Sequence, residues 1–383
     1  MRVLVTSTPG TGHIHPLVPL AAELQAAGHE VVWATGADSC PRVEGYGFRS
    51  SPAGMTGEER RRAFFGEDRG LLELPVRERR QVFLPVMFGA IAAPPMRDDL
   101  VGIVDDLRPD VIVHDLVEFA AAPVATARGI PHVTVSFGAV LTTALLAASA
   151  ASVAEVWVEE GLTPSDTAGL YDHLYLHPLP ASLNAPDASP AVRSVRPMHF
   201  DGATKADEPT WTAAFGQDRP GVYVTFGTEM AAMAPWREVI EALGAVDADA
   251  VVTLGPEVDP ESLGTVPTNV RVEVYVPQRH LLDRAAAVVS HAGSGTLFAA
   301  AERGLPQLCL PIAADQWENA DALAVTGAGL TLEPEQRDPG TIHDALSRLL
   351  DRTAHREAAG SLARDFAALP HPREHLPEIE SLR

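Results

Sequence analysis

Short runs of branched apolar residues recur along this chain, and each is followed by a small or polar turn and then by a helix-like stretch. In the first half these runs cover residues 3–6, 31–34, 111–114 and 132–135. They do not alternate apolar with polar residues, which is typical of strands buried on both faces of a parallel sheet. The first half therefore predicts an α/β fold with a doubly wound sheet covered by helices.

The same pattern starts again after residue 218, with candidate strands at 222–225, 250–253, 270–274, 287–290 and 307–310. A chain of 383 residues exceeds the usual size of one hydrophobic core, so two domains are expected. We expect the chain to be organised as a domain at 1–200, a linker at 201–218, a second domain at 219–354, and a C-terminal helix and tail at 355–383. Two such domains in series imply ligands at the carboxyl ends of the strands and a cleft between the domains.

The net charge of -22 argues against nucleic acid or an anionic membrane surface as a partner, because both need a basic footprint. The only lysine, Lys205, lies in the expected linker, which excludes a Walker loop, a Schiff-base enzyme and a kinase. Cys40 and Cys309 match no metal spacing and indicate a reducing cytoplasm.

Residues 133–154 carry no Asp, Glu, Lys or Arg and have the length of a membrane span, but they are rich in Ser, Thr, Gly and Ala. We favour a strand followed by a buried helix there, with a membrane span as the alternative.

Residues 9–16, Pro-Gly-Thr-Gly-His-Ile-His-Pro, join the first strand to the first helix. A nicotinamide-binding turn needs a third glycine where His15 stands and an acidic residue after the second strand, and neither is present. The turn instead presents His13 at a helix N-terminus. The positive end of the helix dipole disfavours the imidazolium, so a neutral ring there can accept a proton. The alternative is that His13 only caps the helix or packs.

Asp115 follows the strand at 111–114 and so emerges at the same edge of the sheet as His13. A carboxylate bonded to the far imidazole nitrogen would fix the tautomer and stabilise the charge that forms during proton transfer. The alternative for Asp115 is a helix cap. Together the two residues predict a general base and its partner.

The segment 275–320 contains a strand that ends in the Gly-rich turn Ser-His-Ala-Gly-Ser-Gly-Thr at 290–296 and opens a helix. Free backbone N–H groups at such a turn bind phosphate without any lysine. His291 could add a hydrogen bond to a diphosphate, and Asp315 and Gln316 could hold sugar hydroxyls.

With these motifs the chain resembles the family-1 glycosyltransferases, especially the actinobacterial enzymes that glycosylate natural products. The resemblance covers nearly the whole chain and rests on Gly-His-x-x-Pro at 12–16, Val-Thr-Phe-Gly-Thr at 224–228, and the long signature that ends at 315–316. It implies a GT-B fold, in which two Rossmann-like domains face each other across a cleft. It also implies His13 as general base with Asp115 as its partner, and a C-terminal segment that can pack back onto the first domain.

The resemblance assigns the remaining donor positions residue by residue. Tyr275 stands where relatives stack an aromatic ring on the donor base, and Gln278 lies beside it. The diphosphate positions are Thr228, His291, Gly293, Ser294, Gly295 and Thr296. Relatives that use UDP-sugars commonly carry a ribose-binding glutamate where this chain has Ala299, with Glu302 one turn further on. A deoxyribose lacks the 2′-hydroxyl and loses less from this change, so a dTDP-deoxysugar is the expected donor.

The expected reaction is direct displacement with inversion, in which a sugar moves onto a small, largely apolar acceptor. It needs no metal and no cofactor besides the nucleotide sugar. Phe83, Met87, Phe88 and Phe137 are candidates for lining the acceptor pocket, with plain packing as the alternative. The alternatives in function are a sugar-nucleotide epimerase of the same architecture and a catalytically silent partner of another glycosyltransferase. The identities of the acceptor and sugar, an O-, N- or C-linked product, and a homodimer are left open by the sequence.

Overall fold

The structure is a computed structural model that describes residues 1–67, 70–138, 140–186, 189–200, 202, 208–227 and 231–383. The chain divides into two compact units. The first consists of Met1–Leu179, Ala185–Phe200 and Leu369–Arg383, and the second of Pro180–Asn184 and Asp201–Ala368. The expected C-terminal helix and tail at 355–383 are divided between the units, with the residues up to Ala368 in the second and Leu369–Arg383 in the first. Lys205 and part of the expected linker lie outside the described residues.

The first unit is built on a seven-stranded sheet with the order β3-β2-β1-β4-β5-β6-β7. All of its strand pairs are parallel. The strands are β1 (Arg2–Thr6), β2 (Glu30–Thr35), β3 (Arg49–Pro52), β4 (Val111–Asp115), β5 (His132–Val135), β6 (Leu174–His177) and β7 (Val192–Ser194). The four runs that the sequence analysis identified in this half are β1, β2, β4 and β5, so the prediction of a doubly wound parallel sheet is confirmed.

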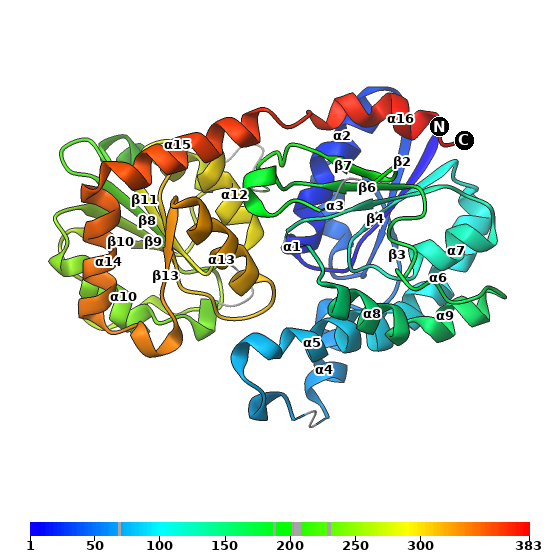
Figure 1. Cartoon of the computed structure of the whole chain (residues 1–383), viewed down its shortest axis with the longest axis horizontal. Helices are drawn as coiled ribbons and strands as arrows, with labels where there is room; N and C mark the ends of the chain where they lie inside the picture. The colour runs from blue at the N-terminus through cyan, green and yellow to red at the C-terminus, as the bar shows by residue number, and fades with distance from the viewer. Residues whose placement is uncertain (68–69, 139, 187–188, 201, 203–207, 228–230) are drawn as a thin grey trace. The chain divides into compact units, whose positions relative to one another are not determined.

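Both faces of this sheet are buried because successive side chains of its central strands point into different hydrophobic clusters. Val3 and Val5 of β1 pack with α2, α3 and α16, whereas Leu4 packs with α6, α7 and α8 on the other face (Figure 1). The helices of this unit are α1 (Thr11–Ile14), α2 (Val18–Ala26), α3 (Cys40–Gly45), α4 (Gly57–Phe65), α5 (Arg80–Leu84), the π-helix η4 (Pro85–Ala92), α6 (Ala93–Leu107), α7 (Ala121–Ala127), α8 (Thr143–Ser152), α9 (Ala154–Glu159) and α16 (Leu376–Glu380). Short 3₁₀ turns are η1 (His15–Leu17), η2 (Leu71–Glu73), η3 (Val76–Glu78) and η10 (Pro372–His375).

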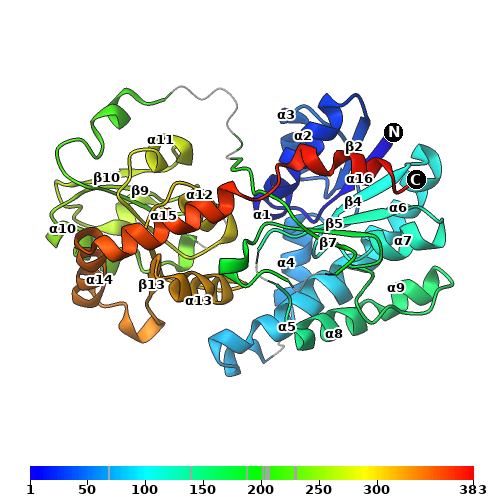
Figure 2. The same ribbon diagram turned by 45° about the horizontal axis from the view of Figure 1, so that its top comes forward.

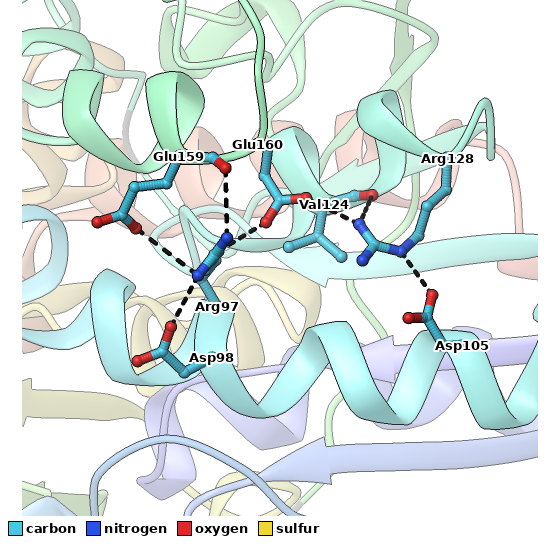
Figure 3. Close-up of polar contacts among 7 residues, drawn as sticks. All are labelled: Arg97, Asp98, Asp105, Val124, Arg128, Glu159 and Glu160. Atoms are coloured by element: carbon cyan, nitrogen blue, oxygen red, sulfur yellow. Dashed lines mark hydrogen bonds and ion pairs between the residues drawn. The ribbon is translucent and has the colours of Figure 1, made fainter.

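A buried carboxylate ties the helices below this sheet together. Glu160 accepts a hydrogen bond from Arg97 Nε of α6 at 2.6 Å and from Nη1 of Arg128, just after α7, at 2.8 Å (Figure 3). Only 6% of the Glu160 side chain is exposed. Asp98 and Asp105 bind the same two arginines from the solvent side. The network links α6 to the ends of α7 and α9.

The second unit repeats the architecture with a six-stranded sheet in the order β10-β9-β8-β11-β12-β13. Its strand pairs are again all parallel. The strands are β8 (Gly221–Thr225), β9 (Asp249–Thr253), β10 (Val270–Glu273), β11 (Ala287–Ser290), β12 (Gln307–Cys309) and β13 (Gly329–Thr331). Five of them match the five runs expected from the sequence.

Helices cover both faces of this second sheet. They are α10 (Trp236–Ala245), α11 (Gln278–Leu282), α12 (Ser294–Glu302), α13 (Gln316–Thr326), α14 (Pro339–Asp351) and α15 (Thr353–Ala367), with 3₁₀ turns η5 (Ala181–Leu183), η6 (Thr210–Ala214), η7 (Ala231–Met233), η8 (Pro260–Leu263) and η9 (Pro334–Gln336). In both views α15 lies along α12 (Figures 1 and 2), where Phe366 meets Phe298 with ring centroids 5.6 Å apart. The last long helix is therefore part of the second unit.

The uncharged stretch at 133–154 is divided between β5 and α8. Within the described part of the chain, no helix is long and apolar enough to cross a membrane. The structure thus has a strand followed by a helix here, as favoured, but only Leu145, Ser149 and Ala150 of α8 are buried.

Candidate active site

His13 lies on α1, directly after the turn that leaves β1 at the carboxyl edge of the first sheet. The turn needs Gly10, whose φ of 120° is a conformation that residues with a side chain rarely adopt. Nδ1 of His13 lies 2.9 Å from Oδ2 of Asp115. The ring is not aligned for a good hydrogen bond at this distance. The predicted pair is thus brought together, because β1 and β4 are neighbours in the sheet.

Asp115 ends β4 and has no solvent-exposed surface. Thr8 Oγ1 donates to its Oδ2 at 3.2 Å, and the backbone N–H of Val117 donates to its Oδ1 at 3.3 Å. These two hydrogen bonds hold the carboxylate toward His13. Asp115 does not cap a helix as the alternative proposed, since α7 begins six residues later.

Aromatic rings surround the imidazole of His13. The ring of Phe88 lies 5.3 Å from it and that of Phe137 lies 5.1 Å away, between centroids. Phe83 in turn contacts Phe88 at 6.0 Å, whereas Met87 is buried in the core cluster of the first unit. The His13 side chain keeps 17% of its surface exposed, and its Nε2 has no protein hydrogen bond among the described residues. Of the four acceptor candidates, Phe83, Phe88 and Phe137 thus lie close to the His13 ring or to one another. Met87 packs in the core of the first unit instead.

A pocket of about 310 Å³, counting the part open to solvent, adjoins this pair within the first unit. Its lining is mostly apolar and comes from the β1–α1 turn, the loop after β3, α4, η4, α6 and the turn after β4: Ser7, Thr8, Pro9, Ala53, Gly54, Met55, Arg60, Phe88, Ala92, Ala93, Met96, Val117, Glu118 and Phe119. Two charged side chains, Arg60 and Glu118, were not singled out from the sequence. Arg60 donates to the Pro9 carbonyl at 3.2 Å, and its guanidinium lies 4.9 Å from the centre of the Phe88 ring.

Glu118 is only 2% exposed. Thr6 Oγ1 donates to its Oε2 at 2.5 Å, and the Ala120 N–H donates to its Oε1 at 2.8 Å. Burial raises the pKa of Glu118 to about 7, with the nearby charge of Asp115 acting in the same direction. This carboxyl therefore keeps its proton to a higher pH than an ordinary glutamate does.

In the second unit, the Gly-rich turn predicted to bind phosphate joins β11 to α12. Gly293 is the N-cap of α12, and no side chain caps this end. The first N–H groups of the helix therefore have no partner within it. The His291 ring fits between two glycines, since a Cβ added at Gly293 would lie 2.4 Å from its Nε2 and one at Gly227 would lie 3.0 Å from its Cε1. Enclosure by the protein lowers the pKa of His291 to about 4, although Asp315 raises it, so the ring is neutral at pH 7.

Asp315 and Ser294 lie close together at the carboxyl edge of the second sheet. Ser294 Oγ donates to Asp315 Oδ2 at 3.0 Å. The side-chain N–H₂ of Asn319 lies 3.1 Å from the same oxygen and 3.0 Å from Ser294 Oγ. Gln316 accepts from the N–H groups of Ile312 and Ala313 through Oε1 at 2.7 and 2.8 Å. Asn319 was not predicted, although its position four residues after Asp315 on a helix was a usable signal.

The other donor candidates occupy different surroundings. Tyr275 is 54% exposed. Gln278 Nε2 donates to Thr296 Oγ1 at 3.3 Å, which places these two candidates together. Gly295 is exposed and follows Gly293 in the turn. Thr228 lies outside the described residues.

The argument for a dTDP donor assumed that position 299 faces the ribose, but Ala299 is buried. Its side chain is 1% exposed and belongs to the hydrophobic cluster between α12 and the second sheet. Ala299 is therefore not open to a ribose in this structure. A preference for dTDP over UDP must be explained in another way than by the missing glutamate at this position.

Comparison with known proteins identifies the family. Residues 77–227 match the N-terminal domain, and residues 237–382 the C-terminal domain, of the family described as Erythromycin biosynthesis protein CIII-like. The L-demethylnoviosyl transferase of Streptomyces niveus is 32% identical, over 97% of this chain and 96% of the relative.

Solved structures of glycosyltransferases share the fold over the full length. The glycosyltransferase VinC in complex with dTDP has a TM-score of 0.82 and 26% identity, covering 100% of this chain and 99% of that one. The spinosyn rhamnosyltransferase SpnG complexed with spinosyn aglycone has a TM-score of 0.81 and 26% identity, covering 99% and 100%. Together with the two parallel-sheet units and their edge motifs, these matches show that the chain belongs to the Erythromycin biosynthesis protein CIII-like family of nucleotide-sugar-dependent GT-B glycosyltransferases of antibiotic biosynthesis.

Proposed function

We propose that this glycosyltransferase moves a deoxysugar from a dTDP donor, with inversion, onto a hydroxyl of a small, largely apolar acceptor, with His13 as general base. The observation that carries the proposal is the contact between His13 Nδ1 and the buried Asp115 Oδ2 at 2.9 Å, beside an apolar pocket. No other histidine among the described residues stands beside this pocket with a buried carboxylate at its ring nitrogen.

Asp115 favours the tautomer of His13 that carries its hydrogen on Nδ1, which leaves Nε2 as the basic nitrogen. The acceptor hydroxyl gives its proton to Nε2 while its oxygen attacks the anomeric carbon. The bond from that carbon to the diphosphate oxygen breaks, and the nucleoside diphosphate leaves with the bonding electrons. The buried carboxylate of Asp115 then stabilises the imidazolium that has formed.

The second unit supplies groups that suit the leaving diphosphate. The N-terminal N–H groups of α12 and the neutral ring of His291 can donate hydrogen bonds, and the exposed ring of Tyr275 can stack on a base. These groups need no lysine. Ser294 and Gln316 are largely engaged with protein partners, which limits what their side chains can offer a ligand.

The preference for dTDP over UDP is supported by relatives rather than by Ala299. VinC is solved in complex with dTDP, and SpnG is also solved with thymidine diphosphate. An apolar acceptor is supported by the lining of the pocket and by the SpnG complex with an aglycone. The relatives transfer sugars, which favours transfer over epimerisation. A homodimer stays a prediction, which sedimentation of the purified chain would test.

The test of the base compares His13→Ala with His15→Ala, because His15 lies on the same turn and binds Tyr46 through Nε2 at 2.9 Å. Turnover of an aliphatic-alcohol acceptor should fall by ~10²–10⁴-fold in His13→Ala only. Calorimetric binding of TDP should be unchanged in both variants. Near-normal turnover by His13→Ala would move the base elsewhere. Equal affinities for TDP and UDP, or tighter UDP, would overturn the dTDP assignment without affecting the role of His13.

A further inference from the structure

We propose that Asn319 is a positioning residue that holds Asp315 and the turn before α12 in the arrangement needed to bind the sugar of the donor, and that Ser294 belongs to this support rather than to the diphosphate site. This inference rests on the proposed function of the second unit as the donor site. It assigns a role to Asn319 and reassigns Ser294.

The side chain of Asn319 is 4% exposed, and its amide nitrogen joins the turn before α12 to the N-cap of α13. Nδ2 lies within hydrogen-bond distance of three acceptors, the carbonyl of Ala292 at 3.1 Å, Ser294 Oγ at 3.0 Å and Asp315 Oδ2 at 3.1 Å, so one of its two hydrogens is shared. Ala292 has a φ of 61°, a conformation that costs free energy for a residue with a Cβ. A hydrogen bond to its carbonyl helps to keep this strained turn in place.

The Asp315 carboxylate is directed by side chains and not by the backbone N–H groups of its helix. It occupies the N-cap position of α13, yet its side chain makes no capping hydrogen bond. Instead Oδ2 accepts from both Ser294 and Asn319. Its Oδ1 has no hydrogen bond to the described residues, so this oxygen can accept one from a sugar hydroxyl.

Ser294 has little left to offer a diphosphate. Its hydroxyl hydrogen is directed to Asp315 Oδ2, and its oxygen accepts from Asn319. A phosphate oxygen needs a donor, and Ser294 could donate to one through its side chain only by giving up the bond to Asp315. We therefore assign its hydroxyl to the support of Asp315.

The neighbouring Gln316 is fixed in the same way. Its Oε1 accepts from two consecutive backbone N–H groups, so the amide cannot turn over without losing both bonds. The Nε2 group is thereby left as the donor. The carboxyl edge of the second sheet thus has one acceptor, Asp315 Oδ1, and one donor, Gln316 Nε2. The protein fixes which of these two atoms accepts and which donates.

The test measures calorimetric binding of TDP and of dTDP-glucose to wild type, Asn319→Ala and Ser294→Ala. TDP reports the nucleotide and diphosphate alone, and the ratio of the two affinities reports the sugar contacts. Asn269→Ala is the matched control. Its Nδ2 also donates to backbone carbonyls, those of Leu243 and Ala248 at 2.9 and 3.0 Å, but it lies before β10, at the amino end of the strand.

We expect dTDP-glucose to bind about 10-fold more weakly to Asn319→Ala, corresponding to one lost charged hydrogen bond. The affinity of the variant for TDP should stay within about 2-fold of the wild-type affinity, because TDP lacks the sugar and feels the substitution only indirectly. Asn269→Ala should lower the melting temperature without changing the ratio of the two affinities. Ser294→Ala should also weaken dTDP-glucose selectively, which keeps the proposal testable if Asn319→Ala does not fold.

Two results would overturn the inference. One is an equal loss of affinity for both ligands in Asn319→Ala. The other is a selective loss of TDP binding in Ser294→Ala, which would return that hydroxyl to the diphosphate. Failure of the wild-type protein to bind TDP at all would instead refute the donor proposal on which the inference rests.

Discussion

Replacement of Glu118 by glutamine should change how the stability of the first unit depends on pH. The folded protein raises the pKa of this buried carboxyl to about 7, against about 4.3 to 4.5 for an unfolded glutamate. Since the folded state holds the proton more tightly, the stabilisation is complete below the unfolded pKa and is lost as pH rises through the folded pKa. The side-chain amide of the Glu118→Gln variant does not titrate, so the variant should lack this dependence.

The magnitude follows from the two pKa values. With about 7 in the folded state and about 4.5 in the unfolded state, linkage gives a loss of about 2–3 kcal/mol in wild type between pH 5 and pH 8. The 2% exposure of Glu118 leaves little solvent screening to reduce this value. The oxygen of the amide can still accept from the Ala120 N–H, and its N–H₂ group can donate to Thr6 Oγ1, since a hydroxyl also accepts, so the fold should tolerate the change.

The assay is urea unfolding of wild type and Glu118→Gln at pH 5, 6, 7 and 8, followed by circular dichroism. Buried histidines such as His114, whose pKa burial lowers to about 4, act in the opposite direction. They act equally in both proteins and cancel in the difference. The unfolding free energy of wild type minus that of the variant should fall by about 2–3 kcal/mol from pH 5 to pH 8. A difference that stays constant across this range would refute the reasoning about Glu118.

Three further substitutions test the packing. Glu160→Gln should lower the unfolding free energy at pH 7 by about 2–4 kcal/mol in the same urea assay, because the partly buried Arg97 and Arg128 lose the charged partner that they share. An unchanged unfolding free energy would contradict this. A Cβ at Gly89 would lie 1.9 Å from Ser152 Oγ, so Gly89→Ala should destabilise by about 1–3 kcal/mol and Ser152→Gly should restore part of the loss. Ala299→Glu, which the sequence resemblance would expect to improve UDP binding, should instead lower the melting temperature, because it places a carboxylate at a 1% exposed position; tighter UDP binding by a stable variant would refute this.

The central strands were predictable because their residues are apolar without interruption, which is what burial on both faces requires. The strands that the sequence analysis missed lie at or toward the edges of the sheets. β3 reads Arg-Ser-Ser-Pro and β7 reads Val-Arg-Ser, and neither contains an apolar run. Their pairing depends on a neighbouring strand being present, and this is a tertiary property that a local pattern does not carry.

His13 and Asp115 could be paired from the sequence because both follow strands whose carboxyl ends share an edge. Arg60 could not be placed by this logic, since it comes from a helix in an insertion and reaches the site through its contact with Phe88. Glu118 stands only three residues after Asp115, yet its importance lies in its burial, which the sequence does not show. The sequence therefore pairs His13 with Asp115 through their strand ends, but it shows neither the reach of Arg60 from α4 nor the burial of Glu118.

The same distinction explains the donor segment. Residues 296–301 of α12 are all buried, so the helix has no polar stripe from which its ligand-facing side could be read. A site built from backbone N–H groups and a neutral His291 also needs no formal positive charge, which is compatible with a chain that contains a single lysine. In such a site the side chains do not attract the ligand by charge but fix the direction of the hydrogen-bonding groups. In the donor site proposed above, Asn319 is such a support, because its amide contacts the Ala292 carbonyl, Ser294 and Asp315.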